Sequence, residues 1–272
     1  MAMFRKKKWW VLVAALLATA LIAIVGAGYA WNFLNLRHQA HVLRIGAELA
    51  WTARRGPGKD EAKIPILMYH SVSEAPIGIE NLSVRPSVFE AQIRYLMENG
   101  FTPLTFDQLQ EAGQYPKPIV ITLDDGYVDN YTQAYPILKK YHCKATVFMI
   151  SNLIDGEGYL SAEQMRAMSD CVCFQSHTVS HSKLAELSEE TVREECFQSK
   201  EAIEKVTGKP VCTLSYPCGS HTTQTASVAE EAYQYAVTVN RGWYHRQISP
   251  YEIPRIEIER SFSLADFKLL IH

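Results

Sequence analysis

Short apolar runs alternate with longer amphipathic stretches from about residue 61 to the end of the chain. The apolar runs are rich in β-branched residues and predict strands, whereas the stretches between them repeat apolar residues at helical spacing. The eight expected strands are Ile64–Tyr69, Phe101–Leu104, Ile119–Leu123, Ala145–Ile150, Val172–Gln175, Val211–Tyr216, Tyr235–Val239 and Ile253–Ile258. The six expected helices are Pro86–Asn99, Asp129–Tyr141, Ala162–Met168, Ser188–Thr207, Thr222–Tyr233 and Leu264–Ile271. This alternation predicts an α/β fold, with a mostly parallel sheet closed into a distorted (β/α) barrel of about seven strands.

A segment from Trp9 to Trp31 is almost wholly apolar, with Thr19 as its only ordinary polar residue. A stretch of about 20 apolar residues crosses a bilayer as a helix, and aromatic residues at both ends suit the membrane interfaces. Because the basic run Arg5–Lys8 precedes this segment, the positive-inside rule places the N-terminus in the cytoplasm. We therefore expect a cytoplasmic tail over 1–8 and a transmembrane helix over 9–31. The protein would be a single-pass protein of the cell membrane, in contact with the lipid bilayer, with an extracytoplasmic main domain.

A cleavable signal peptide is the competing interpretation, with Gly28-Tyr29-Ala30 as a weak cleavage site. Signal peptides have apolar regions of only about 7–15 residues, which favours the uncleaved anchor. Both interpretations export the rest of the chain. Residues 32–60 predict a juxtamembrane helix and a linker that ends in Arg55-Gly56-Pro57-Gly58. The main domain then covers residues 61–272.

Charge divides unevenly between these regions. Residues 1–60 hold nine of the 27 Lys and Arg and two of the 29 Asp and Glu, which leaves 18 basic and 27 acidic residues in the main domain. A domain with this net charge of −9 is a poor partner for nucleic acid, so we expect none. It suits a neutral or amino-bearing ligand better than a polyanion.

Six cysteines occur in the main domain: Cys143, Cys171, Cys173, Cys196, Cys212 and Cys218. Their spacing is not that of a zinc finger, and export would permit disulfides. Alternation on an expected strand makes Cys171 and Cys173 equally compatible with small buried apolar residues. The sequence does not fix any disulfide pairing.

The strand Ile119–Leu123 runs directly into two carboxylates, Asp124 and Asp125, and then Gly126. Unpaired buried carboxylates are costly, so a strand that ends in two of them indicates a polar site. In α/β barrels this is the end of the strand that carries chemistry. Two adjacent like charges also separate their pKa values, which suits acid–base work. The competing interpretation is an aspartate that caps a following helix.

Two histidines, His177 and His181, follow the expected strand Val172–Gln175. Histidines four residues apart project from one face if the loop makes a helical turn, which would bring both imidazoles to one metal ion. Two imidazoles and one carboxylate leave a coordination position for water, as in catalytic rather than structural zinc sites. The alternative is that both are ordinary loop histidines that bind no metal.

Two further strand ends add candidate groups. Ser215-Tyr216-Pro217-Cys218-Gly219 contains a turn that can point a backbone N–H into a site. The strand Ile64–Tyr69 ends at His70. By itself the first segment is typical of an ordinary turn, and a single histidine at a strand end is usually structural, but both fall at the same expected end of the barrel.

Together these segments resemble the NodB-homology polysaccharide deacetylases, carbohydrate esterase family four. The family's Thr-Phe-Asp-Asp-Gly motif appears as Thr122–Gly126, and its His-(Ser/Thr)-x-x-His motif as His177–His181. Its Arg-x-Pro-Tyr-Gly motif corresponds to Ser215–Gly219. The segment Met68–Val72 looks like a membrane- or cell-surface-associated branch of the family, and Lys139–Ile150 is also similar. The resemblance covers about residues 63–272.

The resemblance implies a hydrolase that removes N-acetyl groups from a cell-surface polysaccharide or from peptidoglycan of the cell wall. It implies that Asp125, His177 and His181 hold Zn²⁺ or another divalent transition metal, and that Asp124 is the general base. The oxyanion would then lie against the metal and the backbone N–H of Cys218.

The resemblance also implies a general acid for the departing amine. In the Met-Tyr-His branch this group corresponds to His70, while His272, after Leu269-Leu270-Ile271, is the competing candidate.

Two positions depart from the family pattern. Ser215 stands where the family has the arginine that orients the catalytic aspartate, and Cys218 stands where it has tyrosine. We expect Arg255 to orient Asp124 instead, from another strand. An esterase acting on O-acetyl groups, or a catalytically silent member that binds glycan or metal, would carry the same metal ligands. The sequence leaves both alternatives open.

Overall fold

The structure, a computed structural model, describes residues 34–48, 63–75 and 78–272. The chain divides into two compact units, Met1–Ile45 and Gly46–His272. A helix covers residues 34–48, as expected for the juxtamembrane segment. The expected transmembrane helix over 9–31 lies outside the described residues. Within the described ranges, no helix combines the length and apolarity needed to span a membrane.

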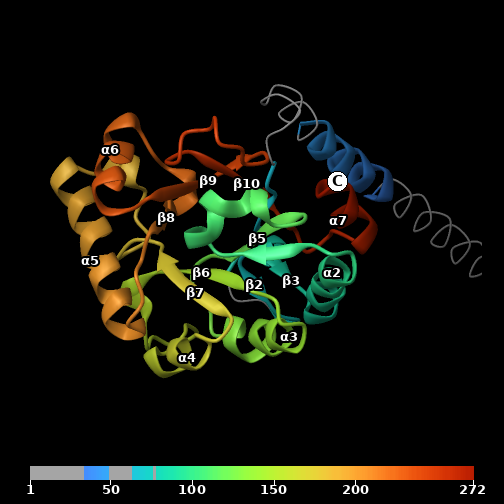
Figure 1. The fold of residues 1–272 in the computed structure, drawn as a ribbon, viewed down its shortest axis with the longest axis horizontal. Coiled ribbons are helices and arrows are strands. Elements are labelled where there is room, and N and C mark those ends of the chain that lie inside the picture. The colour runs from blue at the N-terminus through green and yellow to red at the C-terminus, as the bar shows by residue number, and fades with distance from the viewer. Residues whose placement is uncertain (1–33, 49–62, 76–77) are drawn as a thin grey trace, which may run out of the picture. The chain divides into compact units, whose positions relative to one another are not determined.

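Seven parallel strands form a closed barrel in the second unit (Figure 1). They are β1 (Ile66–Tyr69), β5 (Pro118–Leu123), β6 (Ala145–Met149), β7 (Val172–Ser176), β8 (Thr213–Ser215), β9 (Tyr235–Arg241) and β10 (Ile253–Glu257). Their order is β1-β10-β9-β8-β7-β6-β5, and pairing of β5 with β1 closes the ring. The strand β4 (Thr102–Leu104) pairs with the start of β5. The predicted barrel of about seven strands is confirmed.

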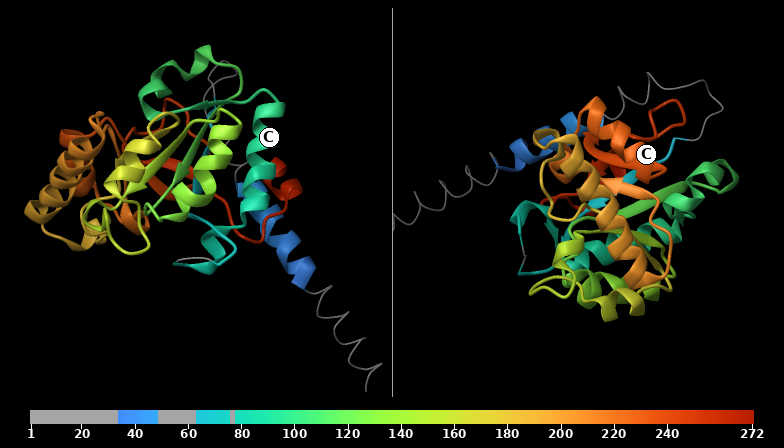
Figure 2. Two further views of the ribbon diagram at one scale, coloured as in Figure 1. Left: turned by 90° about the horizontal axis from the view of Figure 1, so that it is seen from below. Right: turned by 90° about the vertical axis from the view of Figure 1, so that its left-hand side faces the viewer.

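Helices follow the strands and surround the barrel (Figures 1 and 2). They are α2 (Pro86–Glu98), α3 (Tyr135–Lys140), α4 (Ala162–Ala167), α5 (Glu189–Thr207), α6 (Thr223–Ala232) and α7 (Leu264–Leu270). All six expected helices are present. The segment expected as one helix over Asp129–Tyr141 instead begins with a π-helix, η3 (Asn130–Ala134), which continues into α3.

The ends of the longest helix, α5, follow from local side-chain chemistry. Ser188 precedes the helix, and its hydroxyl accepts a hydrogen bond from the backbone N–H of Thr191. This bond satisfies one of the N–H groups that have no partner inside the helix. At the other end Gly208 adopts a φ of 66°, a left-handed conformation that costs glycine little. The helix therefore stops where the sequence predicted.

One apolar cluster of the core fills the barrel toward the amino ends of its strands. Residues at the starts of the strands, including Ile66, Tyr235 and Ile253, cluster with Phe106 and Leu109. The latter two come from η2 (Phe106–Gln114), a 3-10 helix that the sequence did not predict. Because this cluster fills the amino end, the carboxyl end of the barrel is left for polar side chains.

A second feature that the sequence did not predict is a small parallel pair of strands, β2 (Ser71–Val72) and β3 (Ser83–Val84). Buried Asp129 holds the pair to the start of η3. Its carboxylate accepts hydrogen bonds from the Ser71 hydroxyl at 2.5 Å and from the Val72 N–H at 3.1 Å. Two-residue strands carry too little periodicity to be found in the sequence.

Replacing Phe148 with alanine tests the barrel core. Phe148 is fully buried and its ring contacts Phe106 edge-on at 5.8 Å between centroids. We expect Phe148→Ala to lower the free energy of unfolding by about 3–5 kcal/mol, because the lost contacts leave a cavity. Urea unfolding followed by circular dichroism measures this. The control is Phe197→Ala on α5, where the side chain is 38% exposed and the expected change is small. Equal losses in the two variants would contradict this description of the core.

Candidate active site

The carboxyl ends of the strands surround a cavity of about 350 Å³. Asp124 and Asp125 follow β5, His177 follows β7, and His70 follows β1. The cavity lining includes all the predicted site residues except Arg255: His70, Asp124, Asp125, His177, His181 and Cys218. No helix begins at the aspartate pair, so the helix-cap interpretation does not apply. Parallel strands thus bring together residues that are far apart in the sequence.

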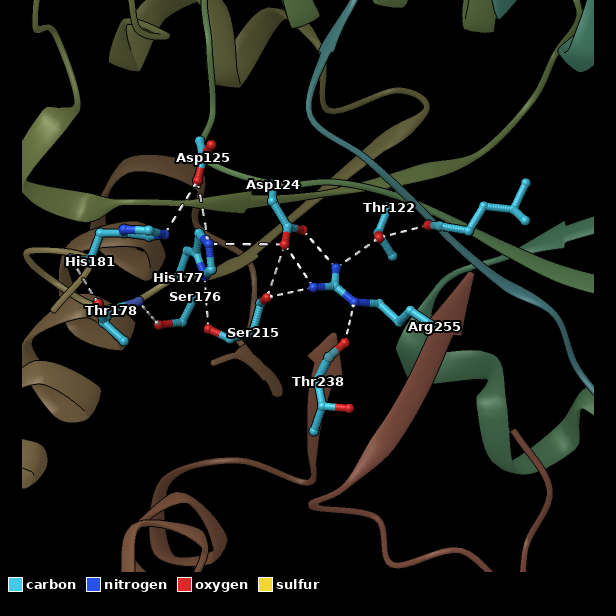
Figure 3. Close-up of polar contacts among 11 residues, drawn as sticks. Thr122, Asp124, Asp125, Ser176, His177, Thr178, His181, Ser215, Thr238 and Arg255 are labelled. Atoms are coloured by element: carbon cyan, nitrogen blue, oxygen red, sulfur yellow. Dashed lines mark hydrogen bonds and ion pairs between the residues drawn. The ribbon is translucent and has the colours of Figure 1, made fainter. Parts of the chain in front are cut away.

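Three of these residues have the geometry of a metal site (Figure 3). The Asp125 Oδ1 lies 3.4 Å from the His177 Nε2 and 3.6 Å from the His181 Nε2. All three ligand atoms lie within 4.8 Å of one another. Two ligands bound tetrahedrally at about 2.1 Å from one ion are themselves roughly 3.4 Å apart. The donor set therefore fits a divalent transition metal, and imidazole with carboxylate suits several such ions.

The orientation of His177 is determined by its second ring nitrogen. Its Nδ1 lies 2.8 Å from the backbone oxygen of Ser215, and since a carbonyl only accepts, Nδ1 carries the proton. This leaves Nε2 as the nitrogen that faces Asp125, an arrangement that metal-binding histidines also have. Burial alone would lower the pKa of His177, but the carboxylates of Asp125 and Asp124 raise it above its ordinary value.

The loop from His177 to His181 is not a helical turn, so the expected reason for the convergence of the histidines was wrong. Thr178 and His181 have φ values of 66° and 60°, in the left-handed region. The His181 N–H donates to the Thr178 hydroxyl at 3.0 Å, which closes the loop on itself. The two imidazoles meet because the loop folds back, with ring centroids 4.7 Å apart.

Arg255 from β10 forms a two-pronged ion pair with Asp124 inside the barrel (Figure 3). The Nη1–Oδ1 and Nη2–Oδ2 distances are both 2.7 Å, and the side chains are 0% and 3% exposed. Burial by itself raises the pKa of Asp124, but the charge and hydrogen bonds of Arg255 lower it well below its ordinary value. Asp124 therefore remains a carboxylate at neutral pH.

The remaining N–H groups of Arg255 are also bound. Its Nη1 donates to the hydroxyl of Thr122 and its Nη2 to the hydroxyl of Ser215, while Nε donates to the carbonyl of Thr238. Thr238 lies in a stretch of β9 where the register against β10 is irregular. A bulge leaves backbone groups without a regular ladder partner, so this carbonyl is available to the guanidinium.

Gly126 allows the turn that separates the two aspartates. Asp125 has a φ of 72° and Gly126 a φ of 78°. A Cβ at position 126 would overlap the Sδ of Met149, so no other residue fits there without displacement. The turn directs the side chain of Asp125 toward the histidines and that of Asp124 toward Arg255 (Figure 3).

The two candidates for the general acid lie in different parts of the fold. His70 lines the cavity, and its buried Nδ1 has no hydrogen-bond partner among the described residues. His272 instead bonds the Tyr95 hydroxyl at 2.9 Å and packs against Phe101, which precedes β4. Since Phe101 lies at the amino end of the parallel sheet, His272 is at the opposite end from the candidate metal ligands.

All six cysteines lie within the described part of the chain and are free thiols, so the disulfides that the sequence left open are not formed. Cys171, Cys173 and Cys212 line a larger cavity, of about 550 Å³, beside the amino ends of β7 and β8. Burial raises the pKa of Cys171 to about 12 and of Cys173 to about 11, which keeps both protonated. This cavity contains none of the predicted site residues.

Sequence reasoning treated Ser215 only as a missing arginine and Thr122 only as part of a motif, and it did not consider Thr238. In the structure the Ser215 hydroxyl lies 3.2 Å from Asp124, and its carbonyl orients His177. Small hydroxyl residues on strands have no spacing that distinguishes a supporting role. The only sequence signal for Ser215 was its position inside a motif.

The chain matches the family model described as polysaccharide deacetylase over residues 111–237. The Bacillus subtilis (strain 168) protein YxkH, whose name assigns it to the polysaccharide deacetylases, is 35% identical over 225 residues, or 80% of this chain and 78% of the relative. This chain belongs to the polysaccharide deacetylase family. A further relative, the poly-beta-1,6-N-acetyl-D-glucosamine N-deacetylase of Staphylococcus aureus (strain N315), is 30% identical over 66% of this chain and 69% of its own length.

Solved structures of deacetylases share the fold. A polysaccharide deacetylase from Bacillus cereus superposes with a TM-score of 0.75 at 34% identity, over 78% of this chain and 70% of that one. The Streptococcus pyogenes deacetylase PplD, solved in complex with acetate, gives a TM-score of 0.74 at 29% identity, over 78% and 99% of the two chains. The observed barrel therefore agrees with membership of the polysaccharide deacetylase family.

Replacing Arg255 with methionine tests the buried ion pair. The variant leaves the Asp124 carboxylate buried without its counter-charge, so we expect the free energy of unfolding at pH 7 to fall by about 3–5 kcal/mol. Urea unfolding measures the loss. The control is Arg193→Met on α5, where the ion pair with Glu231 is solvent-exposed and the expected change is much smaller.

The same variant has an expected pH dependence. In the parent protein the folded pKa of Asp124 is lowered, so the pair stabilises the fold above the unfolded pKa of about 3.9 and this contribution is lost as pH falls further. In Arg255→Met, burial without a counter-charge raises the folded pKa of Asp124. Lowering the pH from 7 toward 5 should therefore narrow the stability gap between the two proteins. A constant gap would contradict an ionised Asp124 as the source of the loss.

Proposed function

We propose that this protein is a metal-dependent deacetylase that hydrolyses N-acetyl groups on amino sugars of a cell-surface polysaccharide or of peptidoglycan. The observation that carries the proposal is the convergence of two carboxylates with different surroundings in one cavity. Asp125 lies between two imidazoles, whereas Asp124 is paired with Arg255. One carboxylate is thus available as a metal ligand and its neighbour as a base.

Asp125, His177 and His181 are the residues that would hold the ion. A bound divalent ion lowers the pKa of water and polarises an acyl oxygen. Because Nδ1 donates to the Ser215 carbonyl, Nε2 is the nitrogen that would bind the ion once it carries no proton. Protons compete with metal for the same nitrogens, and binding should weaken as the histidines become charged at lower pH.

Asp124 would accept the proton from the attacking water. Its carboxylate is ionised at neutral pH and is held by two hydrogen bonds from Arg255, so it does not need to reorient. Its Oδ2 lies 3.9 Å from the His177 Nε2, which places it directly beside the proposed ligand set. Since its lowered pKa makes Asp124 a weak base, its contribution would come mainly from orientation.

His70 would donate a proton to the departing amine. The ring lies in the same cavity, and its buried Nδ1 has no hydrogen-bond partner in the described part of the chain. The backbone N–H of Cys218 is the proposed donor to the oxyanion. Cys218 lies in the turn that follows β8, with a φ of 55°, and it lines the cavity.

The relatives favour an N-acetylglucosamine polymer as the substrate. The Staphylococcus aureus relatives are named for poly-beta-1,6-N-acetyl-D-glucosamine, which is uncharged before deacetylation. The acidic main domain is compatible with a neutral substrate and with an amine product. We further propose that residues 9–31 anchor the protein in the cell membrane with the barrel outside, a proposal supported by the sequence pattern alone.

A deacetylation assay with the full-length protein in detergent tests this function. We expect acetyl release from β-1,6- or β-1,4-linked N-acetylglucosamine oligomers or from peptidoglycan, measured by mass spectrometry. Chelator should abolish it, and Zn²⁺ or Co²⁺ should restore it. Asp124→Asn should lower kcat by about 10²–10⁴-fold, because the general base is removed.

An O-acetylated glycan is assayed in parallel as a second kind of substrate. Release from this substrate alone would indicate an esterase and contradict N-deacetylation. Metal binding without release from any of the substrates would indicate a silent binding protein. Activity that persists after complete removal of metal would contradict the proposed ligand set.

Replacing His70 and His272 one at a time tests which of them is the general acid. We expect His70→Gln to lower kcat by about 10²–10⁴-fold and to remove the limb of the pH–rate profile that reports the acid. His272→Gln should leave the profile unchanged, because that side chain lies at the other end of the barrel. The reverse result would assign the acid to His272 and remove His70 from the mechanism.

A further inference from the structure

The loop that carries both candidate histidine ligands is held from outside by one side chain of α5. The Oε2 of Glu195 accepts hydrogen bonds from the backbone N–H groups of Val179 and Ser180, at 2.8 and 2.9 Å. Its Oε1 accepts a third from the Ser180 hydroxyl at 2.5 Å. Val179 and Ser180 lie between His177 and His181, so all three bonds fall between the two candidate ligands.

The other backbone groups of this loop are bound from a different side. The carbonyl oxygens of Thr178 and Val179 accept from the N–H groups of Ser151 and Asn152, which follow β6. The segment after β6 therefore binds the carbonyl groups of the loop, and Glu195 binds its N–H groups. The Val179 N–H is half-buried and therefore needs a partner, whereas the Ser180 N–H is exposed; Glu195 is the acceptor that both groups use in the described part of the chain.

The conformation of the loop depends on such support. Thr178 and His181 are non-glycine residues in the left-handed region, which L-residues adopt only where their surroundings hold them. If the loop relaxed, the backbone of His181 would leave this region and its Nε2 would move away from Asp125. The 3.6 Å separation between those two atoms is thus linked to the bonds made by Glu195.

We propose that Glu195 is a positioning residue of the metal site. It does not touch the ion; its carboxylate keeps the loop in the one conformation that brings His181 to Asp125. This inference rests on the proposed metal-dependent function. Residues that support metal ligands typically change metal affinity by about 10–100-fold when they are replaced.

Co²⁺ binding by the full-length protein in detergent tests the proposal. Competition with a chelator gives the affinity, and the visible absorption of bound Co²⁺ reports its coordination geometry. We expect Glu195→Met, which keeps length but removes all acceptors, to weaken Co²⁺ binding by about 10–100-fold and to alter the spectrum. Glu195→Gln retains one acceptor oxygen for the two N–H groups, so it should restore most of the affinity. The matched control is Glu194→Met at the adjacent, exposed position of α5, where no change is expected.

Thermal unfolding of the metal-free variants separates positioning from general stability. Cooperative unfolding of Glu195→Met together with weaker Co²⁺ binding supports the proposal. Equal affinity in Glu195→Met and the parent protein would overturn it. Affinity as low in Glu195→Gln as in Glu195→Met would also overturn it, because charge at a distance would then be responsible and not the hydrogen bonds.

Two further outcomes each need an interpretation of their own. If Glu195→Met does not fold, Ser180→Ala, which removes one of the three bonds, gives the answer: altered affinity and spectrum support the proposal, and unchanged values overturn it. If the parent protein itself does not bind Co²⁺, the proposed metal-dependent function fails, and this inference fails with it.

Discussion

The buried pair of Asp124 and Arg255 is the interaction on which the polar end of this barrel depends. Removing two charges from water is costly, and the attraction between them offsets that cost only when every remaining hydrogen-bonding group is also satisfied. Here the guanidinium reaches a carboxylate, two hydroxyls and a carbonyl, contributed by β5, β8 and β9. The pair therefore fixes the strands around it as much as it fixes the carboxylate. The position of the second aspartate, one residue along, follows from the first.

Much of this arrangement was predictable from the sequence, and the remainder has a physical explanation. Strands were found because apolar β-branched runs end abruptly, and Asp124, Asp125 and His177 were found because polar groups at such ends are informative. The left-handed conformation of His181 was not predictable, since it depends on contacts with α5 and with the segment after β6. Glu195 is one of many acidic residues on an amphipathic helix, and nothing in its spacing distinguishes it. The expected transmembrane segment lies outside the described residues and stays a prediction.

Ser215 and Arg255 together suggest how a family motif changes without losing its chemistry. The family resemblance implies an arginine on the strand where this chain has Ser215, and the structure has a guanidinium in contact with Asp124 from β10 instead. A serine occupies less volume than an arginine and leaves space for that side chain. Its hydroxyl also accepts a hydrogen bond from the incoming guanidinium at 3.0 Å. The charge at the aspartate is thus retained while its strand of origin changes, which a comparison of motifs alone reports as a loss.

The sequence positions of these groups have a consequence for the order of assembly. The three candidate metal ligands lie within 57 residues of one another, between Asp125 and His181, whereas Arg255 follows Asp124 by 131 residues. A chain that emerges from its N-terminus presents all three candidate ligands well before the strand β10. Until β10 inserts between β1 and β9, the barrel is open and Asp124 lacks the guanidinium that holds it. A nascent barrel would therefore bring the candidate ligands together before the candidate base is held in position, and the complete site would form only with the last strand.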